Sequence, residues 1–179
     1  MEASTTDRSL IGRMLRAAKL HPDVYEEVEH DREATSQAAI VVVAGSLAVG
    51  IGTALSGGGD FIVQAIALVI FSLIGWALYA WITYFIGTRF LAVPETSADW
   101  GELARTLGFA NAPRILMVFA IGPVLGGIVG LIVGIWVLVT TIVALKAALE
   151  FTTGRAIATA ILGWIVQGLV LGIALSLFL

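Results

Sequence analysis

The run from Ile115 to Leu145 contains 31 residues and no charged side chain. As one α-helix it would be about 46 Å long, whereas the hydrocarbon core of a bilayer is about 30 Å thick. The run is therefore too long for one crossing and too short for two comfortable ones. Gly122 and Pro123 supply a break, because proline lacks the backbone N–H and disfavours helix in the residue before it. We predict two spans, about 103–121 and 124–145, joined by a very tight turn.

Apolar segments of this kind recur along the whole chain. Hydrophobic residues make up 59% of the 179 residues and charged residues only 13%, against about 25% charged residues in average soluble domains. A water-soluble protein of this size could not bury so much apolar surface, so the solvent must be a bilayer. We predict an all-α, polytopic membrane helix bundle of five transmembrane helices. The other three spans are predicted over about 37–55, 61–87 and 156–178.

The first 36 residues carry all of the net charge, with eight acidic and five basic side chains. We therefore divide the chain into a cytoplasmic or interfacial tail, residues 1–36, and a membrane domain, residues 37–179. Within the tail, apolar side chains recur at helical spacing over 7–20, and an acidic helix starts at Pro22. The first helix is basic and amphipathic. It can lie in the membrane interface or pack on protein, and the pattern does not separate these two readings.

The ten lysines and arginines indicate the orientation of the bundle. They lie in the tail, in the connector 87–106, in or near the third span, or beside the loop that precedes the last span. The loops at 56–60 and 122–123 contain none. Because cytoplasmic loops carry an excess of basic residues, we predict a cytoplasmic N-terminus and a C-terminus outside.

Three residues in the predicted third span are unusual for lipid: Asn111, Pro113 and Arg114. An arginine at the middle of a membrane costs about 2.5–3.5 kcal/mol on insertion scales, so it requires a partner or a route to water. Arg114 can extend toward the cytoplasmic headgroups, or it can form a polar intramembrane site with Asn111. Glu102 and Glu150 are the candidate acidic partners, and we include Glu102 in the predicted site.

Glycines recur every four residues in the fourth span and again in the fifth. Such spacing makes a smooth helix face that allows close helix contact in lipid. The contact can be between spans of one chain, or between copies in a homo-oligomer. The predicted packing residues are Gly122, Gly126, Gly130, Gly134, Gly168 and Gly172.

The sequence contains no pattern typical of catalysis. It has no cysteine, no nucleophile motif and no phosphate-binding glycine loop before a lysine. Glu26, His30 and Glu33 share helical spacing used in bundle metal sites, but such sites need matching ligands from other helices. We therefore expect no enzyme activity, no metal and no cofactor.

The segment Gly-Phe-Ala-Asn-Ala-Pro, residues 108–113, resembles a family signature. It is similar to the Gly-Tyr-x-x-x-Pro signature in the third span of the Yip-domain proteins, the Ypt/Rab-interacting membrane proteins. The resemblance covers all the predicted spans, the tight turn at Gly122-Pro123 and the run Thr152–Arg155. The residues that match by motif are Gly108, Phe109 and Pro113, to which the family assigns no chemical role.

This resemblance implies five spans, a cytoplasmic N-terminus and no catalysis. Eukaryotic members of the family are adaptors in vesicle traffic that bind Rab GTPases and form hetero-oligomers. The present sequence lacks their Asp-Leu-Tyr-Gly-Pro motif and has a far shorter tail. It is more similar to prokaryotic members, which implies the cytoplasmic membrane of a prokaryote.

Two functions follow as hypotheses. The first is a non-enzymatic scaffold, adaptor or membrane organiser that works by association. Its candidate partners are the lipid bilayer, a second copy of the chain and a protein that contacts the tail, and no nucleic acid is expected. The alternative is a small transporter or channel with a cytoplasm-facing polar site around Asn111 and Arg114. Few polar residues are available to line a permeation path, which favours the first hypothesis.

Overall fold

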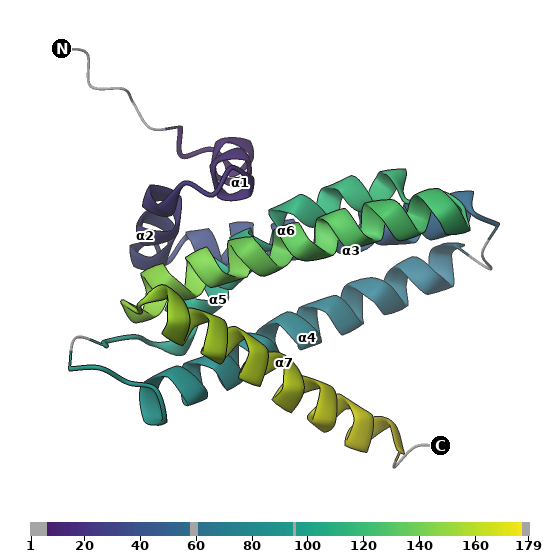
Figure 1. Ribbon diagram of the computed structural model, residues 1–179. Coiled ribbons are helices and arrows are strands. Elements are labelled where there is room, and N and C mark those ends of the chain that lie inside the picture. Colours follow the sequence, from purple (N-terminus) through teal and green to yellow (C-terminus); the bar gives the residue numbers. More distant parts are fainter. Residues whose placement is uncertain (1–6, 58–60, 95, 177–179) are drawn as a thin grey trace.

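The computed structural model describes residues 7–57, 61–94 and 96–176, and every element in this part of the chain is helical (Figure 1). Four helices are long and apolar enough to cross a membrane. These are α3 (Ala34–Leu55), α4 (Phe61–Arg89), α6 (Pro123–Leu149) and α7 (Thr153–Ser176). The shorter elements are α1 (Leu10–Ala18), α2 (Pro22–His30), α5 (Trp100–Ala110) and the 3₁₀ helix η1 (Ala112–Phe119). The predicted all-α membrane protein is confirmed.

The long helices start and end within a few residues of the predicted spans. Where a helix is longer than the predicted span, it extends past the apolar residues, because a helix continues until a capping signal stops it. At one end of the α6 helix, Gly122 has φ +68° and Pro123 occupies the first turn. At the other end, Glu150 adopts the left-handed conformation with φ +52°. The predicted loop 56–60 and the end of the span 156–178 lie partly outside the described residues.

We name the two ends of the bundle for orientation. The tail end holds α1, α2 and the α6–α7 connection; the far end holds the α3–α4 connection and Gly122 (Figure 1). At the far end, the backbone N–H of Gly122 donates to Ser56 Oγ at 2.7 Å. At the tail end, Val24, Tyr25 and Val28 of α2 are fully buried in the same apolar core as Leu103 and Leu149.

The predicted third span is not one continuous helix, which corrects the prediction for residues 103–121. The α-helix stops at Ala110, and the chain continues as η1. Asn111 is the C-cap residue of α5, and its side-chain amide donates to the Leu107 carbonyl at 2.8 Å. Pro113 has no N–H to donate to a carbonyl of the preceding turn, so the α-helical ladder is interrupted and the chain continues in the tighter 3₁₀ pattern. Five spans and the predicted orientation therefore remain predictions beside the four long helices.

Helix α5 runs across the bundle instead of along it. Near its start, the Trp100 indole N–H donates to the carbonyl of Ala77, sixteen residues after Phe61. Near its end, Gly108 packs directly against Ala38, seventeen residues before Leu55. At about 1.5 Å per residue, both ends of α5 are thus about 24–26 Å from the far end. An Asp99–Glu102 capping box, in which each side chain accepts from the other residue's N–H, starts this transverse helix.

Candidate functional site

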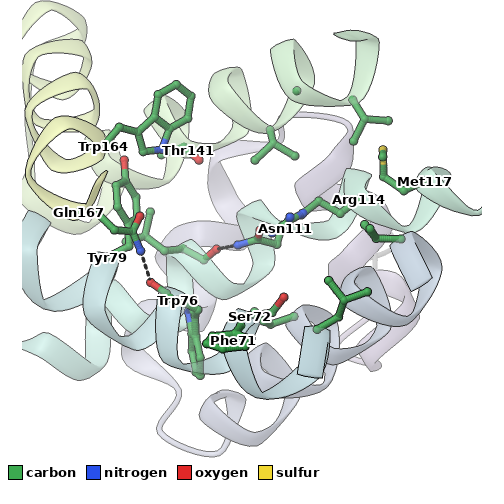
Figure 2. Close-up of a pocket in the computed structure, with 18 of the residues that line it drawn as sticks. Phe71, Ser72, Trp76, Tyr79, Asn111, Arg114, Met117, Thr141, Trp164 and Gln167 are labelled. Carbon is green, nitrogen blue, oxygen red and sulfur yellow. Dashed lines mark hydrogen bonds between the residues drawn. The ribbon is translucent and has the colours of Figure 1, made fainter. Parts of the chain in front are cut away.

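A cavity of about 540 Å³ lies among α3, α4, α6, α7 and the α5–η1 junction (Figure 2). Asn111 and Arg114, two of the three residues of the predicted polar site, line it, and the third, Glu102, does not. Its other walls are mostly apolar and aromatic. They include Val42, Val49, Leu68, Phe71, Ser72, Trp76, Tyr79, Met117, Val133, Val137, Thr141, Trp164 and Gln167.

Arg114 lies deep in the bundle. A Cβ added at Gly45 would be 3.0 Å from the Arg114 Cβ, and Gly45 is ten residues before Leu55, so this backbone is about 15 Å from the far end. The guanidinium donates to Asn111 Oδ1 at 3.4 Å, a long and weak contact. None of the ion pairs found among the described residues includes Arg114. A positive charge therefore faces the cavity without a carboxylate to neutralise it.

Three other polar side chains of the cavity hold helices together. Gln167 Nε2 donates to the Gly75 carbonyl at 2.6 Å, which ties α7 to α4 (Figure 2). The Trp76 indole donates to the Ala104 carbonyl at 2.8 Å, and the Tyr79 hydroxyl donates to the Ala160 carbonyl at 3.1 Å. In a medium without water, such bonds satisfy groups that would otherwise be costly. The polar groups left for chemistry in the cavity are the Arg114–Asn111 pair and the hydroxyls of Ser72 and Thr141.

The structure does not bring the predicted acidic partners to Arg114. Glu102 lies on the first turn of α5, where its carboxylate accepts from the Asp99 N–H at 2.7 Å. Glu102 and Glu150 instead line a second pocket, at the tail end of the bundle. The sequence places all three residues on one side of the membrane, but it does not show that α5 turns across the bundle and separates Glu102 from Arg114.

The second pocket has a volume of about 590 Å³ and is predominantly acidic. Glu29 is only 9% exposed, and burial together with the negative charge of Glu102 raises the pKa of Glu29 to about 7. His30 and Lys146 also line the pocket, with Glu26, Ser97, Ala147 and Glu150. No cluster of three or more His, Asp or Glu in the described part of the chain has the arrangement of a metal site. The His30 ring instead bonds the Glu26 carbonyl, with 2.9 Å between Nδ1 and the oxygen.

The glycines divide into two groups. A Cβ added at Gly108 or Gly52 would lie 2.5 Å from Ala38 Cβ or the Met117 carbonyl oxygen, so both positions require glycine. Of the predicted packing residues, Gly126 is in ordinary contact with Ala120, at 3.5 Å. The others have open space where a Cβ would stand: Gly122, Gly130, Gly134, Gly168 and Gly172. Packing within one chain therefore does not explain them, and Gly130 and Gly134 line the cavity.

Sequence reasoning missed two buried arginines, Arg13 and Arg105. Arg13 is 2% exposed, and its guanidinium donates to Glu27 at 2.9 Å, Asp31 at 2.6 Å and Gln37 at 3.0 Å. Arg105 donates to the carbonyls of Val28 and Glu29 at the C-terminus of α2. These carbonyls lack helical partners, and the helix dipole favours a cation there. The excess of acidic residues in the tail is the sequence signal that could have indicated that an arginine pairs with them.

Family comparison decides what kind of membrane protein carries this cavity. The Yip1 domain model matches residues 19–175 and thus covers all the long helices. The chain belongs to the Yip1 domain family. Gly108, Phe109 and Pro113, which carry the resemblance in the sequence, are buried at the α5–η1 junction of this Yip1 domain. Yip1 domain proteins are membrane-associated and are not known as enzymes. We found no curated protein and no solved structure that matches the chain.

Proposed function

We propose that this Yip1 domain protein is a non-enzymatic scaffold, adaptor or membrane organiser that works through helix association. The proposal depends on the open glycine face of α7. Gly168 and Gly172 have no neighbour among the described residues where a side chain would stand, and neither lines the cavity, whereas Gly130 and Gly134 of α6 do. Large apolar residues beside Gly168 and Gly172 are exposed, among them Leu169 at 61% and Ile173 at 62%. A smooth face flanked by apolar side chains is the surface that a second transmembrane helix can approach closely.

The proposal places the tail end in the cytoplasm and lets the chain cross the membrane five times, with α5 and η1 together as the third crossing. The tail, residues 1–36, then offers its acidic surface to a cytoplasmic partner, while residues 37–179 remain in the membrane. The distribution of basic residues supports this orientation. The lack of the Asp-Leu-Tyr-Gly-Pro motif in the tail supports a further part of the proposal, that the membrane is the cytoplasmic membrane of a prokaryote. A reporter enzyme that works only outside the cytoplasm should therefore be active when it is fused after Leu179, and one that works only inside should be inactive.

A matched pair of glycine variants tests the association. Gly168→Leu fills open space outside the cavity, so the variant should fold normally but lose most of its crosslinking to other copies or to partners in native membranes. Gly52→Leu is the control, because its side chain would collide with the Met117 backbone and should impair folding itself. Crosslinking of Gly168→Leu at the level of the unmodified protein would contradict association through this face.

The cavity supports a second candidate function, a small transporter or channel with Arg114 and Asn111 as its polar site. The observation in its favour is Arg114, whose backbone is about 15 Å from the far end and whose guanidinium forms no ion pair with the described residues, since ionisable groups inside membranes commonly mark a substrate path. An anion is the substrate class that this charge favours. In proteoliposomes, Arg114→Ala should abolish any anion flux, while Arg89→Ala, at the exposed end of α4, should leave it unchanged. Absence of flux in the unmodified protein would reject this candidate.

A further inference from the structure

Helix α1 has three sides with different surroundings. One side is polar: Arg13 and Arg16 form ion pairs with Glu27 of α2, at 2.9 and 2.7 Å. A second side is apolar and open, with Ile11 69% exposed and Leu15 55% exposed. Between them, Ala17 is fully buried against the bundle core. The helix thus contacts protein on two sides and leaves a third, apolar side uncovered.

The ion pairs fix the direction of the uncovered edge. Residues two apart on an α-helix point about 200° apart, so Ile11 and Leu15 both lie nearly opposite Arg13. Arg13 is held by Glu27 and by Asp31, at the C-cap of α2. Because α2 lies toward the tail end, Ile11 and Leu15 are turned toward the far end (Figure 1).

Two contacts fix the depth of α1. The Trp136 indole donates to the Ala18 carbonyl at 2.7 Å, and Trp136 is thirteen residues after Pro123. Arg13 donates to Gln37, eighteen residues before Leu55. At about 1.5 Å per residue these partners are about 20 and 27 Å from the far end. A hydrocarbon layer of about 30 Å that begins at the far end therefore reaches the level of α1.

The axis of α1 runs across the bundle. Figure 1 shows α1 almost end-on, while α3 and α6 extend across the picture. At about the same depth, Ile40 of α3 is also exposed, at 50%, as expected for a side chain that faces lipid. Arg8 and Lys19 are exposed near the two ends of the helix, within reach of headgroup phosphates. This is the arrangement of an amphipathic helix that lies in the plane of a membrane interface.

We propose that α1 is an interfacial anchor whose Ile11 and Leu15 side chains insert into the acyl chains of the tail-end leaflet. The partner of this surface is the lipid bilayer of the protein's own membrane. Both readings of the sequence then apply to one helix: its polar and buried edges pack on protein, and its third edge lies in lipid. The anchor holds the acidic α2 helix against the membrane surface.

The chain contains no cysteine, so single labels report cleanly on this surface. Ile11→Cys, Leu15→Cys and the control Asp23→Cys, each labelled with the environment-sensitive dye NBD, are reconstituted full-length into phosphatidylcholine–phosphatidylglycerol vesicles. Lipids with a bromine or nitroxide on the acyl chain then quench dyes that lie in the hydrocarbon. We expect at least threefold stronger quenching at positions 11 and 15 than at 23, which is an exposed site on α2.

Equal quenching at all three positions would overturn the proposal. So would dyes at 11 and 15 that are shielded from lipid quenchers while crosslinking between copies, because the apolar edge would then bind a second chain. A second variant keeps the test independent of the dye. Leu15→Glu should make α1 at least tenfold more sensitive to protease in vesicles, whereas Glu26→Gln, on α2, should not; unchanged sensitivity in Leu15→Glu contradicts insertion.

Discussion

Arg13 and Arg114 are both surrounded by protein, yet their environments differ completely. Arg13 lies in the tail-end layer, by which we mean α1, α2 and the first turn of α3. There, Glu27, Asp31 and Gln37 accept hydrogen bonds from its guanidinium. The positive charge of Arg13, through a direct hydrogen bond, holds the pKa of Asp31 below its usual value. Arg114 lies beside the cavity, where its guanidinium donates to the amide oxygen of Asn111 at 3.4 Å and forms no ion pair with the described residues.

The difference shows what each charge does. A buried charge whose hydrogen bonds are satisfied by its own protein fixes the structure and has little left for a ligand. A charge that faces a cavity without a partner costs free energy and remains available to an anion or water. The charges of the tail-end layer are therefore structural, and within the described chain the cavity is the place where binding of an anion is to be sought.

The largest expected effect is on the tail-end layer. Arg13→Gln should lower the free energy of unfolding by about 3 kcal/mol, the lower end of the range for a broken buried ion pair, because Glu27 keeps Arg16 as a partner. Denaturant titration in detergent micelles measures the change. Arg8→Gln is the control: its side chain is 77% exposed and 3.9 Å from Glu27, so the loss should be under about 0.5 kcal/mol. Equal losses in the two variants would remove the distinction between paired and exposed arginines.

An intermediate effect is expected from pH. The folded protein holds the Glu29 proton to about pH 7, whereas the usual pKa of this carboxyl is 4.5. The contribution of Glu29 to stability is therefore complete below pH 4.5, decreases as pH rises, and is lost above pH 7. Above pH 7 the unfavourable contribution amounts to about 2–3 kcal/mol.

Glu29→Gln isolates this contribution, because His30, Glu26, Glu102, Glu150 and Lys146 line the same pocket and stay unchanged. The variant should be more stable than the unmodified protein at pH 8 and no more stable at pH 4.5. Thermal unfolding followed by tryptophan fluorescence across this range gives the difference. A difference that does not vary with pH would show that Glu29 titrates normally.

The smallest effect on stability is expected at the cavity. Arg114→Gln removes a charge that has no ionic partner, so the free energy of unfolding should change by less than about 1 kcal/mol or increase slightly. The same denaturant titration used for Arg13→Gln measures it. A loss as large as that of Arg13→Gln would mean that Arg114 is a structural residue, and the contrast between the two regions would fail.

The sequence predicted the membrane bundle, the break at Gly122-Pro123 and the shared location of Asn111 and Arg114. These follow from composition and local chemistry, since long apolar runs and proline act within a few residues. The direction of α5 and the partner of Arg13 were not predictable in this way. Glu27, Asp31 and Gln37 are 14 to 24 residues from Arg13, and a contact at that separation depends on how α1, α2 and α3 pack.

The glycines also show that a local sequence pattern does not identify the neighbour from another helix. Gly130 and Gly134 have the regular spacing that suggests close contact, but they have open space, whereas Gly52 and Gly108 are in tight contact. Spacing identifies a smooth helix face, and it does not identify the neighbour that occupies it. Similarly, Glu102 has the charge to pair with Arg114 but is used to cap α5.

The 3₁₀ helix η1 has a consequence for the length of the chain between the cavity and the far end. Its eight residues extend about 16 Å at 2.0 Å per residue, and the same eight residues as an α-helix would extend about 12 Å. Proline in the first turn is compatible with both forms. The segment between Asn111 and the turn at Gly122 thus spans about 4 Å more of the bundle than the same residues would as an α-helix, which lets eight residues cover the distance from the cavity toward the far end.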